Sequence, residues 1–311
     1  MSTKGLTDIP GVLVGHASDY DGLTGCTVVL FNGGAAGGVD IRGSATGTEE
    51  LDLLSPLHLT ERVHAVVLAG GSAFGLEAAS GVRRYLEHKG IGFETPAAKV
   101  PLVPAAIIYD LAIGKASARP TREMGEVAAG AASSAAVPEG AVGAGTGATV
   151  GKLRGMDHAM KSGLGTATVE MPGGVLVSAL AVVNALGNVI DPASGKIVAG
   201  TRKSTSSTEL APAPGQNTTL VVVATNARLS KVQATKLAQF GSLGVARTIA
   251  PVWTTQDGDI TFAFSCGTLE ANLDTLGVAA ADAVSKAILR AVRLAPSMGG
   301  LPGLAKNRPL R

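Results

Sequence analysis

The most informative stretch of this chain reads Pro214-Gly215-Gln216-Asn217-Thr218-Thr219-Leu220-Val221-Val222-Val223-Ala224-Thr225-Asn226. A loop-type segment rich in Pro, Ala and Gly leads into two threonines and then into a strongly apolar run. Threonine and valine both favour extended backbone in a partly buried sheet. The stretch therefore predicts a β-strand whose first residue is Thr218.

The same junction suggests a catalytic arrangement. If the peptide bond between Asn217 and Thr218 is cut, the hydroxyl and a free α-amine belong to one residue at the start of a strand. An adjacent amine can activate such a nucleophile, as in N-terminal nucleophile hydrolases. An ordinary loop-to-strand junction explains these residues as well, so the rest of the chain has to distinguish the two interpretations.

Composition limits the classes of protein to consider. The chain has 311 residues, of which 46% are hydrophobic and 16% charged, and its mean hydropathy is +0.31; these values indicate a large buried core. The net charge of +2 and the lack of a basic stripe give nucleic-acid binding little support. No apolar run approaches the roughly 20 residues of a membrane helix, and the N-terminus lacks the apolar region of a signal peptide. We expect a cytoplasmic protein that neither spans nor binds a membrane.

Apolar periodicity and turn residues predict the order of the elements. Strands are expected at Gly11–His16, Cys26–Phe31, Val63–Ala69, Gly165–Met171, Val175–Asn184 and Asp259–Ser265, in addition to the one at Thr218. Helices are expected at Glu49–Leu54, Ala73–His88, Pro104–Leu111, Glu123–Ser134, Lys231–Phe240 and Leu273–Arg293. Loops are expected at Gly33–Gly47, at 137–151 and at Thr201–Gln216. Without a convincing linker or repeat, this order predicts one domain over residues 1–311, with sheets covered by helices, in the α+β class.

Three familiar site types are not supported. Ser72 lies between a strand and a helix, but an esterase nucleophile elbow requires glycine where Phe74 stands. A phosphate loop ending at Lys152 would require glycine at Thr146 and Ser or Thr at Leu153. The five histidines are scattered and the two cysteines are too few for a zinc cluster, so no metal and no cofactor are expected.

One pair of carboxylates stands out, in Asp257-Gly258-Asp259 just before an apolar strand. In extended backbone a spacing of two places both side chains on the same side. Two close carboxylates can hold an ammonium group or perturb each other's pKa. A solvated Asp-Gly turn is the alternative, because this dipeptide is common in turns.

Several stretches, taken together, resemble the P1 (DmpA-type, S58) peptidase family. They are Leu68–Ala79, Val103–Asp110, Gly143–Lys152, Ala181–Gly187 and Asn217–Thr219. The family includes aminopeptidase/D-esterase enzymes, β-peptidyl aminopeptidases, a pantetheine hydrolase and nylon-oligomer (6-aminohexanoate-oligomer) endo-hydrolases. The threonine and the two aspartates resemble the nylon-hydrolase branch, whereas the β-aminopeptidase branch has a serine and a Ser-x-Glu pair.

The resemblance implies an αββα sandwich and a precursor that cleaves itself into fragments 1–217 and 218–311. It also implies a homotetramer or larger homo-oligomer. Thr218 falls on the nucleophile, with Asp257 and Asp259 as its partners. Tyr109, Lys152 and Asn184 fall on positions of substrate or catalytic contact.

The chemistry of these residue types agrees with the roles that the resemblance implies. Thr218 would form an acyl-enzyme, with its α-amine moving the protons and the two aspartates supporting it. Asn184 could donate to an oxyanion, Lys152 could assist self-cleavage and Tyr109 could contact substrate. Each residue type also has an ordinary structural explanation: asparagine is common in turns, lysine in solvated loops, and the tyrosine ring can pack in the core.

The expected function is hydrolysis of amide bonds in small peptides or peptide-like oligomers. The choice among α-peptides, β-peptides, D-amino-acid amides and nylon oligomers stays open, as does endo against exo cleavage. Two alternatives stand beside hydrolysis: acyl transfer of the ornithine-acetyltransferase type, and a non-catalytic binding protein that keeps the fold.

Overall fold

The structure, a computed structural model, describes residues 4–202 and 217–305, so most of the loop expected at Thr201–Gln216 lies outside the described residues. Within them a nine-stranded sheet has the order β10-β11-β14-β16-β2-β4-β7-β3, with β1 paired to β2. The strands are Val12–Asp19 (β1), Thr24–Ile41 (β2), Thr48–Glu49 (β3), Val63–Ala69 (β4), Ala105–Ile107 (β7), Leu164–Met171 (β10), Val175–Asn184 (β11), Thr218–Ala227 (β14) and Ile260–Leu269 (β16).

Strand β2 is long enough to belong to two layers. Its first part pairs with β1 and β4, and its last part, Ala36–Ile41, pairs with β16. Between these parts Gly33 and Gly34 have φ values of +79° and +72°. Glycine adopts such angles without steric cost, so β2 can leave the first layer here and enter the second.

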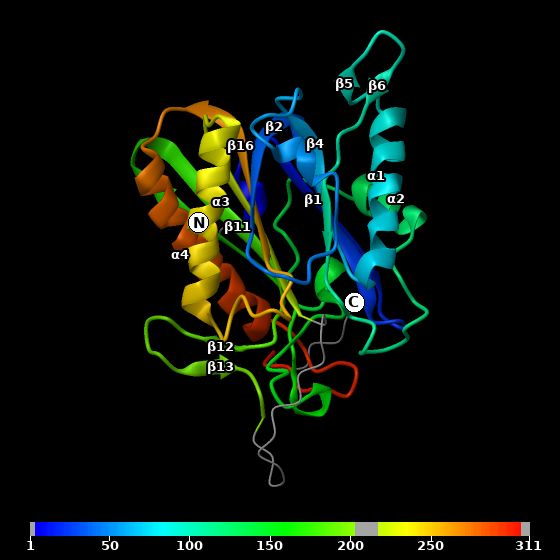
Figure 1. The fold of residues 1–311 in the computed structure, drawn as a ribbon, viewed down its shortest axis with the longest axis vertical. Helices are drawn as coiled ribbons and strands as arrows, with labels where there is room; N and C mark the ends of the chain where they lie inside the picture. The colour runs from blue at the N-terminus through cyan, green and yellow to red at the C-terminus, as the bar shows by residue number, and fades with distance from the viewer. Residues whose placement is uncertain (1–3, 203–216, 306–311) are drawn as a thin grey trace.

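Helices cover the two layers in pairs. Glu77–His88 (α1) packs with Arg122–Gly130 (α2), and Lys231–Thr248 (α3) packs with Leu273–Arg293 (α4). Figure 1 shows the two pairs on opposite sides of the strands. Large apolar cores of the described chain lie under α1 and α2, between the two strand layers, and under α3 and α4. This order of helix, sheet, sheet and helix confirms the predicted αββα sandwich.

Strand β14 is the strand predicted at Thr218. Val221 and Val223 belong to the core under α3 and α4, whereas Leu220 and Val222 belong to the core between the strand layers. Successive residues of a strand point to opposite faces. A strand that is buried on both faces therefore needs apolar residues at every position, which explains the uninterrupted run in the sequence.

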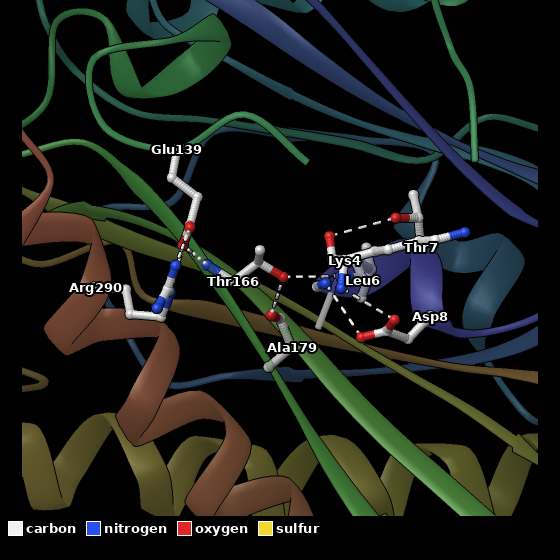
Figure 2. A network of polar contacts seen from close by, with 9 residues as sticks. Lys4, Leu6, Thr7, Asp8, Glu139, Thr166, Ala179 and Arg290 are labelled. Atoms are coloured by element: carbon white, nitrogen blue, oxygen red, sulfur yellow. Dashed lines mark hydrogen bonds and ion pairs between the residues drawn. The ribbon is translucent and has the colours of Figure 1, made fainter. Parts of the chain in front are cut away.

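The edge strand β10 is tied to segments distant in the sequence, as Figure 2 shows. The main-chain N–H of Leu6 donates to Oγ1 of Thr166 at 2.9 Å, and the N–H of Thr166 donates to Oε1 of Glu139 at 2.9 Å. Glu139 is in turn paired with Arg290 of α4. These contacts cover part of a sheet edge that would otherwise expose unpaired main-chain groups.

Three sequence predictions of secondary structure were wrong. Pro104–Leu111 is not a helix, because its first half forms β7, which pairs in parallel with β4. Glu49–Leu54 contains the end of β3 and only a short 3₁₀ turn. The glycine-rich segment Gly33–Gly47 is largely strand rather than loop, and a Cβ at Gly38 would lie 2.1 Å from the main-chain nitrogen of Thr235 in α3. Gly38 thus allows β2 and α3 to pack closely against each other.

The two long helices are close to their predictions. Helix α4 has the predicted bounds. Helix α3 begins after its predicted N-cap, Ser230, but continues past Phe240 to Thr248. Its Gly244 lies against α4, where a Cβ would be 2.4 Å from the carbonyl oxygen of Ala281. Across the described residues, no helix has the length and apolar character needed to cross a bilayer.

Candidate active site

The predicted site residues meet where three neighbouring strands begin or end. Strand β11 is antiparallel to β14, so its last residue, Asn184, lies directly opposite the first residue of β14, Thr218. Strand β16 runs parallel to β14 and starts at the same level, with Ile260 opposite Leu220. The two aspartates precede β16, which places them beside the start of β14.

The peptide bond between Asn217 and Thr218 is buried, and its carbonyl oxygen is held from two sides. Oγ1 of Thr218 donates to this oxygen at 2.5 Å, and the main-chain N–H of Gly258 donates to it at 2.8 Å. Asn217 is 1% exposed and Thr218 3%. The N–H of Gly258 on the carbonyl oxygen favours attack on the carbonyl carbon, because it stabilises the charge that develops.

Gly258 reaches this position because it has no side chain. A Cβ there would lie 2.7 Å from Oγ1 of Thr218 and 2.5 Å from the carbonyl oxygen of Ala45. No sequence motif predicts a role for this glycine. Its place between two acidic residues that precede a strand is the only signal in the sequence that could have suggested one.

Both aspartates are buried, so they do not form a solvated turn. Oδ1 of Asp259 accepts a hydrogen bond of 2.5 Å from the N–H of Thr219. Oδ2 of Asp257 accepts from the main-chain N–H and the hydroxyl of Thr254, at 2.9 and 2.7 Å. Burial raises the pKa of Asp259 to about 7, and the charge of Asp257 adds to this effect. A carboxyl group with such a pKa can exchange protons near neutral pH.

Lys152 is buried beside Asn184 and is not a solvated loop lysine. Its Nζ donates to the main-chain oxygen of Asn184 at 3.0 Å and to Oδ1 of the same residue at 2.9 Å. Burial lowers the pKa of Lys152 to about 7, although the charges of Asp257 and Asp259 act in the opposite direction. A lysine with this pKa is partly neutral at pH 7 and can accept a proton.

Asn184 joins several segments around the site. Besides Lys152, its Oδ1 accepts from the N–H and the hydroxyl of Thr149, at 3.1 and 3.2 Å. Its Nδ2 donates to the main-chain oxygen of Tyr109 at 3.0 Å. The side-chain amide of Asn184, which was predicted to bind an oxyanion, therefore donates to the protein's own main chain. The carbonyl oxygen of Asn217 instead accepts a hydrogen bond from the N–H of Gly258.

Tyr109, the predicted substrate-contacting residue, is half-buried and lines a narrow recess. Lys152 also lines this recess, so the recess adjoins the cluster around Asn184. The other lining residues are Asp110, Ala112, Ile113, Gly147, Thr149 and Met156. Asp110 was not predicted as a site residue; burial raises its pKa to about 6, and it accepts a hydrogen bond of 2.6 Å from the N–H of Gly71.

The second glycine-rich loop does not have the geometry of a phosphate site. Carbonyl oxygens of Gly145 and Ala148 point inward and accept from Nζ of Lys161, at 3.1 and 2.9 Å. A phosphate-binding loop instead turns N–H groups toward its ligand. In residues 4–202 and 217–305, no three His, Cys, Asp or Glu side chains gather as a potential metal site.

Comparisons with known proteins show which family this chain matches. The model of Peptidase family S58 matches residues 4–305. An uncharacterized aminopeptidase of Mycobacterium leprae (strain TN) is 39% identical over 96% of this chain and 92% of its own length. A 6-aminohexanoate-oligomer endohydrolase of Kocuria sp. (strain KY2) is 32% identical over 92% of this chain and 85% of its own.

A solved structure shares the fold. It is the L-aminopeptidase D-Ala-esterase/amidase of Ochrobactrum anthropi, whose structure is described as a variant of the Ntn hydrolase fold. The match has a TM-score of 0.77 at 22% identity and covers 96% of this chain and 88% of that chain.

Proposed function

This chain belongs to peptidase family S58 and is a peptide-bond hydrolase with an Ntn hydrolase fold, and we propose that it acts through Thr218 after cutting itself between Asn217 and Thr218. One observation carries this proposal: the hydroxyl of Thr218 lies against the carbonyl oxygen of Asn217, with the N–H of Gly258 on the same oxygen. A nucleophile and an oxyanion donor thus meet at the bond to be cut.

Self-cleavage begins with attack of Oγ1 of Thr218 on the carbonyl carbon of Asn217. The C–N bond breaks, an ester forms through the threonine oxygen, and the nitrogen leaves as the free α-amine of Thr218. Water then hydrolyses the ester, which leaves a carboxylate on Asn217 and restores the hydroxyl. No α-amine exists before the cut, so another base must accept the hydroxyl proton and deliver it to the leaving nitrogen, and the lowered pKa of Lys152 supports this residue in that role.

In the mature enzyme the same hydroxyl attacks the amide carbonyl of a substrate. The α-amine of Thr218 accepts the hydroxyl proton and delivers it to the leaving amine, and water resolves the acyl-enzyme. Asp257 and Asp259, both buried beside the start of β14, orient the amine and balance its charge. Asn184 holds Lys152 and faces Thr218 in the strand pairing, which supports a positioning role for it.

The relatives and the recess beside Tyr109 support two candidate substrate classes. The likeness to aminopeptidases supports small peptides with a free N-terminus, and the likeness to the Kocuria enzyme supports 6-aminohexanoate oligomers. The recess at Tyr109 and Lys152 is narrow, which favours an unbranched acyl group. Rates on aminoacyl p-nitroanilides and on 6-aminohexanoate oligomers, measured side by side, identify the preferred class. Product analysis with an added amine acceptor separates hydrolysis from acyl transfer.

The decisive experiment is intact-mass analysis of the purified protein. We expect fragments 1–217 and 218–311 in the wild type and one uncut chain in Thr218→Ala, which should also lack amidase activity. Thr225→Ala, in the same strand, serves as the control and should be cut. An active wild-type preparation that consists only of uncut chain contradicts the proposal.

A further inference from the structure

The segment that follows β2, Arg42–Ala45, lies against the loop that carries Gly258. In the antiparallel ladder between β2 and β16, Ile41 lies opposite Ile260. The residues just after β2 therefore meet the residues just before β16, although the two segments are far apart in the chain. Figure 1 shows the two strands side by side. This neighbour of the Gly258 loop has no role in the mechanism described above.

Main-chain hydrogen bonds from the 42–45 segment hold both neighbours of Gly258. On one side, the carbonyl oxygen of Asp259 accepts from the first two N–H groups of the segment, at 3.0 and 3.2 Å. On the other side, the carbonyl oxygen of Asp257 accepts from the N–H of Ala45 at 2.9 Å. The N–H of Gly258, which donates to the carbonyl oxygen of the bond to be cut, lies between these two anchored residues.

The two segments can approach so closely because each has a glycine at the contact. A Cβ on Gly43 would lie 2.3 Å from the carbonyl oxygen of Asp257 and 2.3 Å from the main-chain nitrogen of Asp259. From the other side, a Cβ on Gly258 would lie 2.5 Å from the carbonyl oxygen of Ala45. Glycine is the residue that permits such a close approach of two backbones, so any side chain at Gly43 should push the segments apart.

The end of β2 is itself fixed just before this segment begins. Oδ2 of Asp40 accepts from Oγ of Ser242 in α3 at 2.6 Å and from Nε of Arg42 at 2.8 Å. Asp40 is buried, and hydrogen bonds to a carboxylate are stronger than those between neutral groups. The 42–45 segment therefore starts from a point that is tied to α3 as well as to β16.

We propose that the 42–45 segment is a positioning clamp for the oxyanion donor: it holds the residues on both sides of Gly258, so that the N–H of Gly258 stays directed at the carbonyl oxygen under attack. No atom of the segment takes part in bond making, so the segment acts through Gly258. A donor that is already fixed needs no reorganisation when charge develops on the oxygen. The catalytic meaning of the clamp rests on the proposed function, but the placement of the N–H does not.

The first measurement follows the Gly258 amide itself, by NMR-detected hydrogen exchange in uncut Thr218→Ala protein. We expect this amide to exchange slowly, and Gly43→Ala to speed its exchange by about tenfold or more. Gly37→Ala is the matched control, since it lies in the same strand but the nearest contacts of its Cβ would be side-chain atoms, at 2.7 Å and beyond. It should change the exchange of Gly258 only as far as it changes global stability.

The second measurement separates positioning from mere support of the fold, in chains that keep Thr218. Gly43→Ala should slow self-cleavage by about tenfold or more relative to Gly37→Ala at similar stability. In the chains that are cut, it should lower kcat and leave KM within about twofold, because an oxyanion donor acts in the transition state. Gly37→Ala should keep the wild-type rates of both reactions.

Unchanged exchange of the Gly258 amide in Gly43→Ala overturns the proposal, as does self-cleavage at the rate of Gly37→Ala. If Gly43→Ala does not fold, Ala45→Pro carries the same test, because proline lacks the N–H that donates to the loop. Ala45→Ser, which keeps this N–H, is then the control, and equal exchange in these two variants also overturns the clamp. If instead the wild type proves not to be cut before Thr218, the exchange measurements still stand, so the two failures are distinguishable.

Discussion

The main-chain N–H of Gly258 lies 2.8 Å from the carbonyl oxygen of Asn217 and donates to it. This contact links the loop that carries both aspartates to the bond predicted to be cut. Because an N–H on the oxygen stabilises the tetrahedral intermediate, the loop supplies an oxyanion donor as well as carboxylates. The contact depends on the close approach of Gly258 to Thr218, which only glycine permits.

Gly258→Ala should slow self-cleavage by roughly 100-fold, because the added Cβ would lie 2.7 Å from Oγ1 of Thr218 and would displace it from the carbonyl. The fraction of cut chain against time, from intact-mass measurements, gives the rate. Gly130→Ala is the control, since its Cβ would meet only Tyr85, at 3.9 Å. Equal rates in the two variants would show that the close approach of Gly258 is unimportant.

Lys152→Met should accumulate uncut chain, since it removes the buried amine proposed to accept the hydroxyl proton. Lys152→Arg should not restore cutting, because a guanidinium stays protonated. Lys161→Met is the matched control: Lys161 is also buried, and its pKa is also lowered to about 7, but its Nζ donates to the main-chain carbonyls of Gly145 and Ala148 rather than to Asn184. Loss of cutting in both methionine variants, at equal stability, would argue against a specific role for Lys152.

The rate of self-cleavage should rise with pH and level off above about 7. Burial lowers the pKa of Lys152 to about 7, so its neutral form, which accepts the proton, is depleted in acid and predominates in base. Freshly denatured and refolded precursor, cut at a series of pH values, gives this profile. A rate that falls as the pH rises from 6 to 8 would contradict a neutral lysine as the base.

Asp259→Asn should make the uncut chain more stable at pH 8 while abolishing activity. Burial raises the pKa of Asp259 from 3.8 to about 7, so the folded chain holds this proton more tightly than the unfolded chain does. Stability is therefore full below about pH 4 and falls as the pH rises to about 7. At pH 8 the substitution should therefore increase the free energy of unfolding by up to about 4 kcal/mol. This increase should vanish near pH 4. Denaturant unfolding in the Thr218→Ala background measures it, and equal stability at pH 8 would oppose this assignment.

Tyr109→Phe should change substrate turnover without affecting self-cleavage. The main-chain oxygen of Tyr109 accepts the hydrogen bond from Asn184, and phenylalanine keeps this oxygen, while Tyr109 also lines the recess beside Lys152. We expect KM to rise about tenfold if the hydroxyl binds substrate. Unchanged kinetics on every substrate that the enzyme accepts would remove Tyr109 from the binding site.

Local patterns identified the parts of the site but not their arrangement. The sequence located Thr218 at the start of one strand and the two aspartates before another. This was possible because the preferences of neighbouring residues determine where a loop passes into a strand. It did not reveal that Gly258 donates to Asn217 or that the amide of Asn184 bonds to Tyr109. Those contacts join segments 41 and 75 residues apart, and no local preference specifies them.

The sequence by itself determined the order of most elements, the α+β class and the residue types that the chemistry needs, since apolar periodicity and turn residues act over a few positions; the αββα sandwich came from the family resemblance. Only the tertiary structure decided that Pro104–Leu111 contributes a strand, because pairing with β4 overrides its helical pattern. It also decided the protonation behaviour of Lys152 and Asp259. Burial sets their pKa values near 7, and burial is a property of the packed chain, which no single stretch of sequence contains.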